Sequence, residues 1–230
     1  MSSTINHPLS TINSSPLRLI QAGVGGMGGA WVNALKGRAD VEVVALVDIA
    51  DTPLIEGGDK LNVPAERRFK DLVAAIDAVD ADAVLTVTPP AVHVKHAEVA
   101  FSRGLHLLTE KPIGTTLDDT KKMVRLADAA GKILMVAQNY RYSPPMQTLI
   151  RLVREQPLGP LGSGHIDFYI PGDFRKTFRQ TMQFPLLVDM AIHHLDLIRT
   201  VTGQNIATVT ADTWNPPGSD YQHHAGLKML

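Results

Sequence analysis

The chain has 230 residues, of which 44% are hydrophobic and 20% are charged, and its formal net charge at pH 7 is -1. These values are ordinary for a soluble globular protein, and the length is enough for one large domain or two small ones. The nearly neutral charge gives no indication of nucleic acid or an anionic membrane as a partner. The absence of cysteine excludes disulfides, thiolate metal sites and a cysteine nucleophile.

Residues 1–16 are rich in Ser, Thr, Asn and Pro and have neither a basic start nor an apolar centre. This composition predicts a disordered tail and not a signal peptide. No apolar run in the sequence reaches the length of a membrane span. A cytoplasmic location is therefore the default expectation.

Residues 17–28 read LRLIQAGVGGMG, a short apolar run that ends at glycines spaced G-x-G-x-x-G. This pattern predicts the first strand, tight turn and first helix of a dinucleotide-binding unit. Gly23 permits the turn, Gly25 lets a pyrophosphate approach the backbone, and Gly28 lets the helix pack closely on the strand.

Gly26 and Met27, which lie between Gly25 and Gly28, are also counted among the cofactor-binding residues, and a helix is predicted to follow the turn. Amides in the first turn of a helix have no intrahelical acceptor and lie at the positive end of the helix dipole. They are therefore suited to a diphosphate.

An acidic residue completes the fingerprint. Residues 41–47 predict the second strand, and Asp48 ends it, twenty residues after Gly28. A carboxylate there can accept hydrogen bonds from the adenosine ribose hydroxyls, although a surface aspartate at a strand end is the simpler alternative. Ile49 follows and no arginine is adjacent, which favours NAD over NADP.

The next segments alternate between apolar strands and amphipathic helices. This alternation predicts an α/β domain over residues 17–140 with a doubly wound parallel sheet. Residues 50–66 are expected to form a short helix and a loop. The expected buried strands are 83–88, 105–109 and 133–137, and the expected helical segments are 70–79, 91–103 and 116–130.

Residues 141–230 have a different pattern and predict the start of a second, α+β domain with an open sheet. Helices are expected over 144–155 and 186–202, and half-exposed strands over 164–170 and 206–212. Two strands rarely form a stable sheet alone. We therefore expect that another chain completes the sheet or that the sequence is the front part of a longer protein.

Three clusters beyond the glycines could carry chemistry. The first is Glu110-Lys111-Pro112, at the carboxyl end of a predicted strand, where ligands bind in doubly wound sheets. A lysine there can donate a hydrogen bond to a substrate oxygen. A solvated turn is the alternative reading.

The second cluster is Thr88-Pro89-Pro90 with His93. Its position after a buried strand suggests contact with the cofactor, although His93 could equally pack locally.

The third cluster is Asp189-Met190-Ala191-Ile192-His193. Aspartate and histidine at i and i+4 share one helix face, and histidine can take a proton from an alcohol as hydride leaves carbon. The pair could instead be a packed polar contact between domains. A metal site that also uses His194 and Asp196 is less favoured, because these two point away from the first pair on an ideal helix.

Together these motifs resemble the Gfo/Idh/MocA family of oxidoreductases, over residues 17 to about 212. The matching positions, in chain order, are Gly23, Gly25 and Gly28; Asp48; Thr88-Pro89 with His93; Glu110-Lys111-Pro112; Asn139-Tyr140-Arg141; and Asp189, His193 and Asp196.

The resemblance implies an NAD(P)-dependent dehydrogenase acting on a sugar, polyol or related cyclic alcohol. It implies that Lys111 hydrogen-bonds the reacting oxygen, that His193 is the general acid/base and that Asp189 holds the substrate or tunes the proton relay. It places Glu110 near the nicotinamide and Asn139 among the cofactor-binding residues, and it predicts a cis peptide before Pro112. It also implies a homo-oligomer formed through the C-terminal sheet.

The sequence departs from the family at Gln183-Phe184-Pro185, where glycines are common, and at Ala191, where the family often has glycine. Members also usually continue through several further strands. Two alternatives therefore stay open. One is a non-catalytic NAD-binding regulator or partner subunit, and the other is an NAD-dependent glycoside hydrolase.

Overall fold

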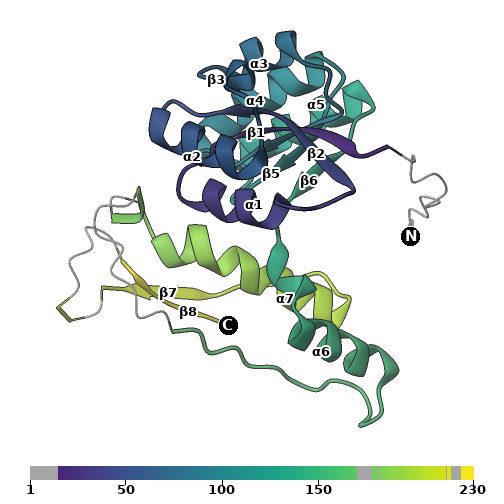
Figure 1. Cartoon of the computed structure of the whole chain (residues 1–230). Helices are drawn as coiled ribbons and strands as arrows, with labels where there is room; N and C mark the ends of the chain where they lie inside the picture. Colours follow the sequence, from purple (N-terminus) through teal and green to yellow (C-terminus); the bar gives the residue numbers. More distant parts are fainter. Residues whose placement is uncertain (1–14, 170–177, 181, 216, 219–223) are drawn as a thin grey trace. The chain divides into compact units, whose positions relative to one another are not determined.

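The computed structural model describes residues 15–169, 178–180, 182–215, 217–218 and 224–230. Most of the tail expected at residues 1–16 lies outside this range. The chain forms two compact units, the first ending at Val136 and the second beginning at Ala137 (Figure 1). The sequence placed this boundary after residue 140. Each unit is described by itself.

The first unit contains a six-stranded parallel sheet in the order β3-β2-β1-β4-β5-β6. The chain leaves β1 in one direction to build β2 and β3 and then crosses back to build β4, β5 and β6, which confirms the doubly wound prediction. The strands are β1 (Leu17–Ala22), β2 (Val41–Val47), β3 (Arg68–Phe69), β4 (Ala83–Thr86), β5 (His106–Thr109) and β6 (Leu134–Val136). The two-residue β3 is too short to produce a periodic pattern and was not predicted.

Helices cover both faces of this sheet (Figure 1). Helices α1 (Met27–Leu35) and α2 (Asp51–Leu61) pack on one face, and α3 (Leu72–Ala78), α4 (Pro90–Ser102) and α5 (Leu117–Ala130) pack on the other. A short 3₁₀ turn, η1 (Ala65–Arg67), precedes β3. The start of α5 has the predicted capping box between Thr116 and Asp119, and its end has the predicted left-handed Gly131.

The last strand differs from its prediction. The sequence indicated that residues 133–137 form a strand buried on both faces, but Ile133 is 63% exposed and Met135 is 48% exposed. The reason is topological, because β6 lies at the edge of the sheet and pairs only with β5. An apolar run of this length therefore marked a strand correctly but did not reveal its position in the sheet.

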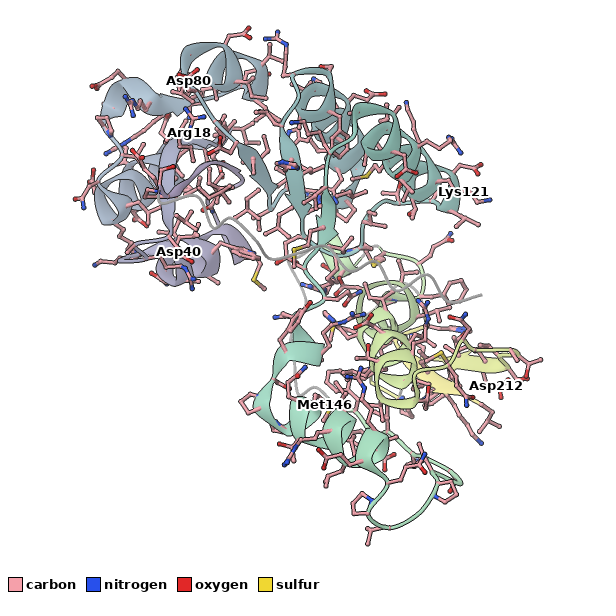
Figure 2. All side chains as sticks on the ribbon, turned by 90° about the vertical axis from the view of Figure 1, so that its right-hand side faces the viewer. Arg18, Asp40, Asp80, Lys121, Met146 and Asp212 are labelled. Atoms are coloured by element: carbon pink, nitrogen blue, oxygen red, sulfur yellow. The ribbon has the colours of Figure 1, made fainter. Side chains whose placement is uncertain are left out.

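An ion pair lies at the amino ends of the strands. Arg18 donates from its backbone N to Asp82 at 2.8 Å and from its guanidinium to the same carboxylate at 2.8 and 3.2 Å. Figure 2 shows Arg18 near Asp80, whose carboxylate lies 3.7 Å away. The contact joins β1 to the turn before β4, at the end of the strands opposite the glycine turn.

The second unit is built around two helices that pack on each other, α6 (Pro144–Glu155) and α7 (Ala191–Thr202). A 3₁₀ turn, η2 (Asn139–Tyr142), precedes α6, and a second one, η3 (Phe178–Gln180), follows it in the chain. The helix predicted over 186–202 is α-helical only from Ala191, because Leu186–Met190 (η4) forms a π-helical turn. Strands β7 (Ala211–Trp214) and β8 (Gly226–Met229) form a two-stranded antiparallel sheet.

In this unit one strand prediction was wrong and the bounds of another were displaced. Residues 164–169 form no strand, and residue 170 lies outside the described range. Residues 206–210 are irregular, and the strand begins only at Ala211. Alternation of polar and apolar residues cannot reveal which segment finds a partner, and here the partner is the unpredicted β8. Within the described residues, no helix is both long and apolar enough to cross a membrane.

Candidate active site

Buried polar side chains mark where each unit departs from an ordinary apolar core. Six polar or charged side chains are buried among the described residues, namely Gln21, Thr86, His93, Thr109, Asp189 and His193. The first four lie at or next to the carboxyl ends of β1, β4 and β5, and the last two lie in η4 and α7. Because burying polar groups is costly unless they are hydrogen-bonded, this clustering points to sites and not to general packing.

The glycine turn follows β1 and has the geometry that the fingerprint predicts. Gly23 has φ +90°, and a Cβ atom added there would lie 2.5 Å from the Val87 carbonyl oxygen. A Cβ on Gly28 would lie 2.3 Å from the Gly23 carbonyl oxygen. The fold itself therefore requires glycine at these two positions.

Gly25 is different. A Cβ added there would meet its nearest neighbour, Pro53, at 3.4 Å, and Gly25, Gly26 and Met27 are exposed. Internal packing therefore does not explain a glycine at position 25. A bare backbone beside an open surface does fit the approach of a diphosphate, and no side chain caps the start of α1.

Asp48 lies directly beside this turn. Its Oδ2 accepts hydrogen bonds from the Val24 and Gly25 amides at 2.7 and 3.2 Å, and its Oδ1 accepts one from Ala50 at 2.9 Å. The carboxylate thus fixes the glycine turn while it remains partly exposed. Lys70 lies close to the same loop, with its Nζ 3.1 Å from the Ile49 carbonyl oxygen and 2.5 Å from Asp51 Oδ1.

Gln21 supports the turn from below and was not singled out from the sequence. Its Nε2 donates to the carbonyl oxygens of Gly23 and Gly28 at 3.0 and 2.9 Å, and the side chain is fully buried. The available signal was a polar residue two positions before the first glycine, in the buried half of β1 that is otherwise apolar. Such a residue can satisfy turn carbonyls that the helix and strand leave unpaired.

His93 lies between the turns that follow β4 and β5. Its Nε2 is 2.8 Å from the Thr88 carbonyl oxygen, and its Nδ1 is 3.1 Å from both the Pro112 carbonyl oxygen and Thr109 Oγ1. The imidazole is fully buried on α4. His93 was expected among the cofactor-binding residues, and its ring nitrogens lie within hydrogen-bond distance of backbone carbonyl oxygens in two loops.

Burial lowers the pKa of both histidines on this face of α4. For His93, burial is opposed by the carbonyl oxygens of Thr88, Ile113 and Pro112, and the pKa is still below its ordinary value. For His96, burial and the nearby charges of His93 and Lys95 lower the pKa to about 4. His96 Nδ1 lies 2.8 Å from Thr86 Oγ1, which is 3.0 Å from Thr88 Oγ1.

Glu110 and Lys111 follow β5. The Trp31 indole Nε1–H donates to Glu110 Oε1 at 2.8 Å, and the Lys111 backbone N donates to Glu110 Oε2 at 3.1 Å. The peptide between Lys111 and Pro112 is cis, as the resemblance implied. Trp31 lies on α1, so this contact joins the helix after the glycine turn to the turn that carries the lysine.

The carboxyl edge of the sheet thus brings together the predicted residues of the first unit. The Gly23 amide donates to the Val47 carbonyl oxygen, the Val87 amide to that of Ala22, and the Glu110 amide to that of Thr86, at 2.8, 2.7 and 2.9 Å. These bonds place the glycine turn, Asp48, Thr88-Pro89 and Glu110-Lys111 on consecutive neighbouring strands. In open α/β sheets, ligands bind at this edge, where the strand order reverses between β1 and β4.

The remaining predicted residues, Asn139, Asp189 and His193, lie in the second unit. Asp189 is 1% exposed, and the Arg179 Nε donates to its Oδ2 at 2.6 Å. His193 is 3% exposed, and its ring stacks on Tyr140 with centroids 4.1 Å apart and planes 7° apart. Asn139 is exposed at the start of η2.

Arg141 and Asp196 form an ion pair that joins η2 to α7. The guanidinium donates to both carboxylate oxygens, with Nε 2.9 Å from Oδ2. The Asp196 carboxylate raises the pKa of Arg141. Within the described residues, no group of three or more acidic or histidine side chains is arranged to hold a metal ion.

Comparison with known proteins identifies the family. Residues 17–138 match the Gfo/Idh/MocA model, described as an oxidoreductase family with an NAD-binding Rossmann fold. The chain belongs to the Gfo/Idh/MocA family. Its first unit is therefore the NAD-binding Rossmann fold of that family, in agreement with the glycine turn and Asp48.

Individual relatives align with most of the chain. It is 33% identical over 214 residues to the uncharacterised protein y4oX of Sinorhizobium fredii, covering 89% of this chain and 59% of that one. It is 27% identical to myo-inositol 2-dehydrogenase of Thermotoga maritima, covering 85% and 58%. The chain thus spans less than two thirds of the length of these relatives.

Solved structures of the same fold agree. An oxidoreductase from Agrobacterium radiobacter, crystallised with NAD+, L-tartaric acid and magnesium, matches with a TM-score of 0.82 at 24% identity, covering 93% of this chain and 62% of that one. A myo-inositol 2-dehydrogenase from Lactobacillus plantarum matches with a TM-score of 0.79 at 23% identity, covering 93% and 65%. At these identities the likeness shows a shared fold.

Proposed function

We propose that this protein is an NAD-dependent oxidoreductase that transfers hydride between the nicotinamide and a carbon bearing a hydroxyl group in a sugar, polyol or related cyclic alcohol. The observation that carries the proposal is the edge formed by the glycine turn, Asp48 and Glu110-Lys111 on adjoining strands. The names of family relatives, among them D-apiose dehydrogenase and myo-inositol 2-dehydrogenase, support this substrate class.

The residues of the first unit account for binding and for one part of the chemistry. The exposed Gly25–Met27 backbone receives the diphosphate, and Asp48 accepts hydrogen bonds from the adenosine ribose. Glu110 borders the nicotinamide, and the Lys111 ammonium donates a hydrogen bond to the reacting oxygen. When bound, the nicotinamide accepts or supplies the hydride.

The residues of the second unit account for the proton. In the oxidation direction, the His193 imidazole takes the hydroxyl proton as the carbon loses hydride and becomes a carbonyl carbon. In reduction, the imidazolium returns that proton to the oxygen. Asp189 accepts a hydrogen bond from the Arg179 guanidinium, and it acts by binding a substrate hydroxyl or by stabilising the imidazolium.

The test is NADH formation measured with a panel of inositols, pentoses and other polyols. A good substrate gives steady NADH production, and Lys111→Ala and His193→Ala each lower kcat by about 10²- to 10⁴-fold. Lys121→Ala, at an exposed lysine on α5, is the matched control and leaves kcat unchanged (Figure 2). Cofactor binding with unchanged kinetics in both site variants indicates a regulator instead. Sugar release from a glycoside without net NADH indicates a hydrolase.

The proposal includes a cytoplasmic location and assembly into a homo-oligomer through the second unit. Exposed apolar side chains in this unit, including Leu158, Val209 and Trp214, support such an assembly. Light scattering coupled to size-exclusion chromatography tests it, since a monomeric mass at micromolar concentration contradicts it.

A further inference from the structure

His193 is held by a neighbour that the proposed mechanism does not use. The Tyr140 ring lies face to face with the imidazole, with centroids 4.1 Å apart and planes 7° apart. His193 is 3% exposed, and Tyr140 is partly buried. A parallel stack fixes the plane of the imidazole and so fixes the directions in which its two ring nitrogens point.

The segment that carries Tyr140 is itself anchored to the helix that carries His193. Arg141, the next residue, donates from its guanidinium to both oxygens of Asp196, which lies three residues after His193. The Arg141 carbonyl oxygen accepts a hydrogen bond from Gln147 Nε2 at 2.6 Å. Two neighbouring residues of η2 therefore contact α7, one through a ring stack and the other through an ion pair.

From this arrangement we infer that Tyr140 is a positioning residue for the proton-transferring imidazole of His193, and that the Arg141–Asp196 ion pair holds Tyr140 in place. The inference rests on the proposed function, because it gives His193 the role of general acid/base. It also assigns Asp196 a role that the sequence motif alone did not give. Asp196 fastens the segment that orients His193 and takes no part in proton transfer.

The stack has an electronic consequence as well as a geometric one. The face of an aromatic ring carries negative charge density and favours a cation above it, so Tyr140 stabilises the imidazolium over the neutral ring. Other charged or titratable side chains are close in the chain or joined to these contacts. They are Asp189 with its partner Arg179 on η4 and η3, His194 and Asp196 on α7, and Arg141 and Tyr142 on η2.

The test is an NMR titration of the His193 ring in the full chain, without cofactor or substrate. The chain has nine histidines, and His193→Gln identifies the signal of interest by its loss. We expect Tyr140→Leu to lower the pKa of His193 by about half a unit or more, as loss of a cation–π contact predicts. Tyr140→Phe keeps the ring face and leaves the titration within about 0.2 units of the original.

Asp196→Asn is the second variant, because it keeps the shape of the side chain and removes only its charge. We expect it to shift the His193 titration in the same direction as Tyr140→Leu, by a smaller amount. Thermal melting verifies that each variant is folded at the temperature of the titration. An unchanged His193 titration in folded Tyr140→Leu overturns the inference.

Kinetics provide an independent readout. With an accepted alcohol as substrate, Tyr140→Leu lowers kcat by about tenfold or more and shifts the acidic limb of the plot of kcat against pH. The KM for NAD stays within about twofold of the wild-type value. Tyr140→Phe restores both. Equal losses in Tyr140→Phe and Tyr140→Leu contradict the inference. The NMR titration is independent of turnover, so a failure of the proposed function is seen separately, as wild-type protein that makes no NADH.

Discussion

The indole Nε1–H of Trp31 donates to Oε1 of Glu110 at 2.8 Å, across 79 residues of sequence. The contact fixes the acidic residue before Lys111 to the helix that follows the glycine turn. The other oxygen of Glu110 accepts the Lys111 amide, so the described structure uses both carboxylate oxygens. The orientation of this side chain is thus set before any ligand arrives.

Trp31→Phe is expected to raise the Kd for NADH by about tenfold, because it removes one hydrogen bond to a charged group and keeps the ring. Titration calorimetry measures the effect. Energy transfer from the indole to bound NADH gives a second measurement. In Trp214→Phe, where Trp31 is the remaining tryptophan of the two in the chain, the transfer should persist. Unchanged affinity in Trp31→Phe would show that Glu110 does not need this contact.

Two alanine substitutions in the glycine turn are expected to affect different properties, one the stability of the first unit and the other the affinity for NADH. Gly28→Ala places a Cβ 2.3 Å from a backbone oxygen and should destabilise the first unit by about 1–3 kcal/mol or more. Gly25→Ala places a Cβ 3.4 Å from Pro53 and 4.0 Å from Asp48 Oδ2 and should melt within a few degrees of wild type, but it should weaken NADH binding by at least about tenfold. Melting curves and calorimetry separate the two. Full NADH affinity in Gly25→Ala contradicts the proposed diphosphate position.

Cofactor choice is expected to depend on Lys70 as well as on Asp48. Lys70 is bonded to the Ile49 carbonyl oxygen and to Asp51, so in the native protein its charge is already balanced beside the ribose acid. Asp48→Ser combined with Asp51→Asn removes both carboxylates and leaves the ammonium available to a 2′-phosphate. The ratio of Kd values for NADPH and NADH should then fall by about 10- to 100-fold. Adding Lys70→Met should reverse this gain in relative affinity for NADPH. If the gain persists in that triple variant, Lys70 is not its source.

Acid should destabilise the first unit through His96, whose pKa is lowered in the folded chain. The pKa of His96 is about 4 in the folded chain and near 6.5 when unfolded, so the unfolded state binds more protons between these values. The contribution of His96 to the free energy of unfolding is therefore fully present above about pH 6.5. It falls toward pH 4, by up to about 1.4 kcal/mol per pH unit for this one proton. Urea denaturation across this range should show a shallower fall in His96→Gln. His165→Gln, at an exposed histidine, should keep the original slope.

Much of the first unit could be predicted from the sequence because its signals are local. Gly23, Asp48 and Glu110-Lys111 each follow the last residue of an apolar strand in the parallel sheet. Since every carboxyl end lies at one edge, the strand pattern alone predicts that these residues share a face. The exposure of β6 could not be predicted in this way, because it depends on which strand ends the sheet.

The second unit was harder to predict because its decisive contacts are long-range. Strand β7 begins five residues later than expected, at Ala211 and not 206, since its register is set by β8. The bonds of Arg179 to Asp189 and of Arg141 to Asp196 join separate elements and leave no periodic pattern. A sequence motif can identify a candidate aspartate or histidine, but it does not identify the residues that contact and orient it. Those residues are found only from the three-dimensional structure.

The π-helical turn at Leu186–Met190 carries Asp189, whereas His193 lies in the α-helix that follows. The π-helical turn closes an i to i+5 hydrogen bond, from the Ala191 amide to the Leu186 carbonyl oxygen, so it holds one residue more than an α-helical turn. The wider turn absorbs that residue, and Asp189 and His193 are both buried although they lie in different kinds of helix. An extra residue inserted within α7 between the turn and His193, with no wider turn to absorb it, would instead rotate the imidazole by about 100° around the helix axis relative to Asp189.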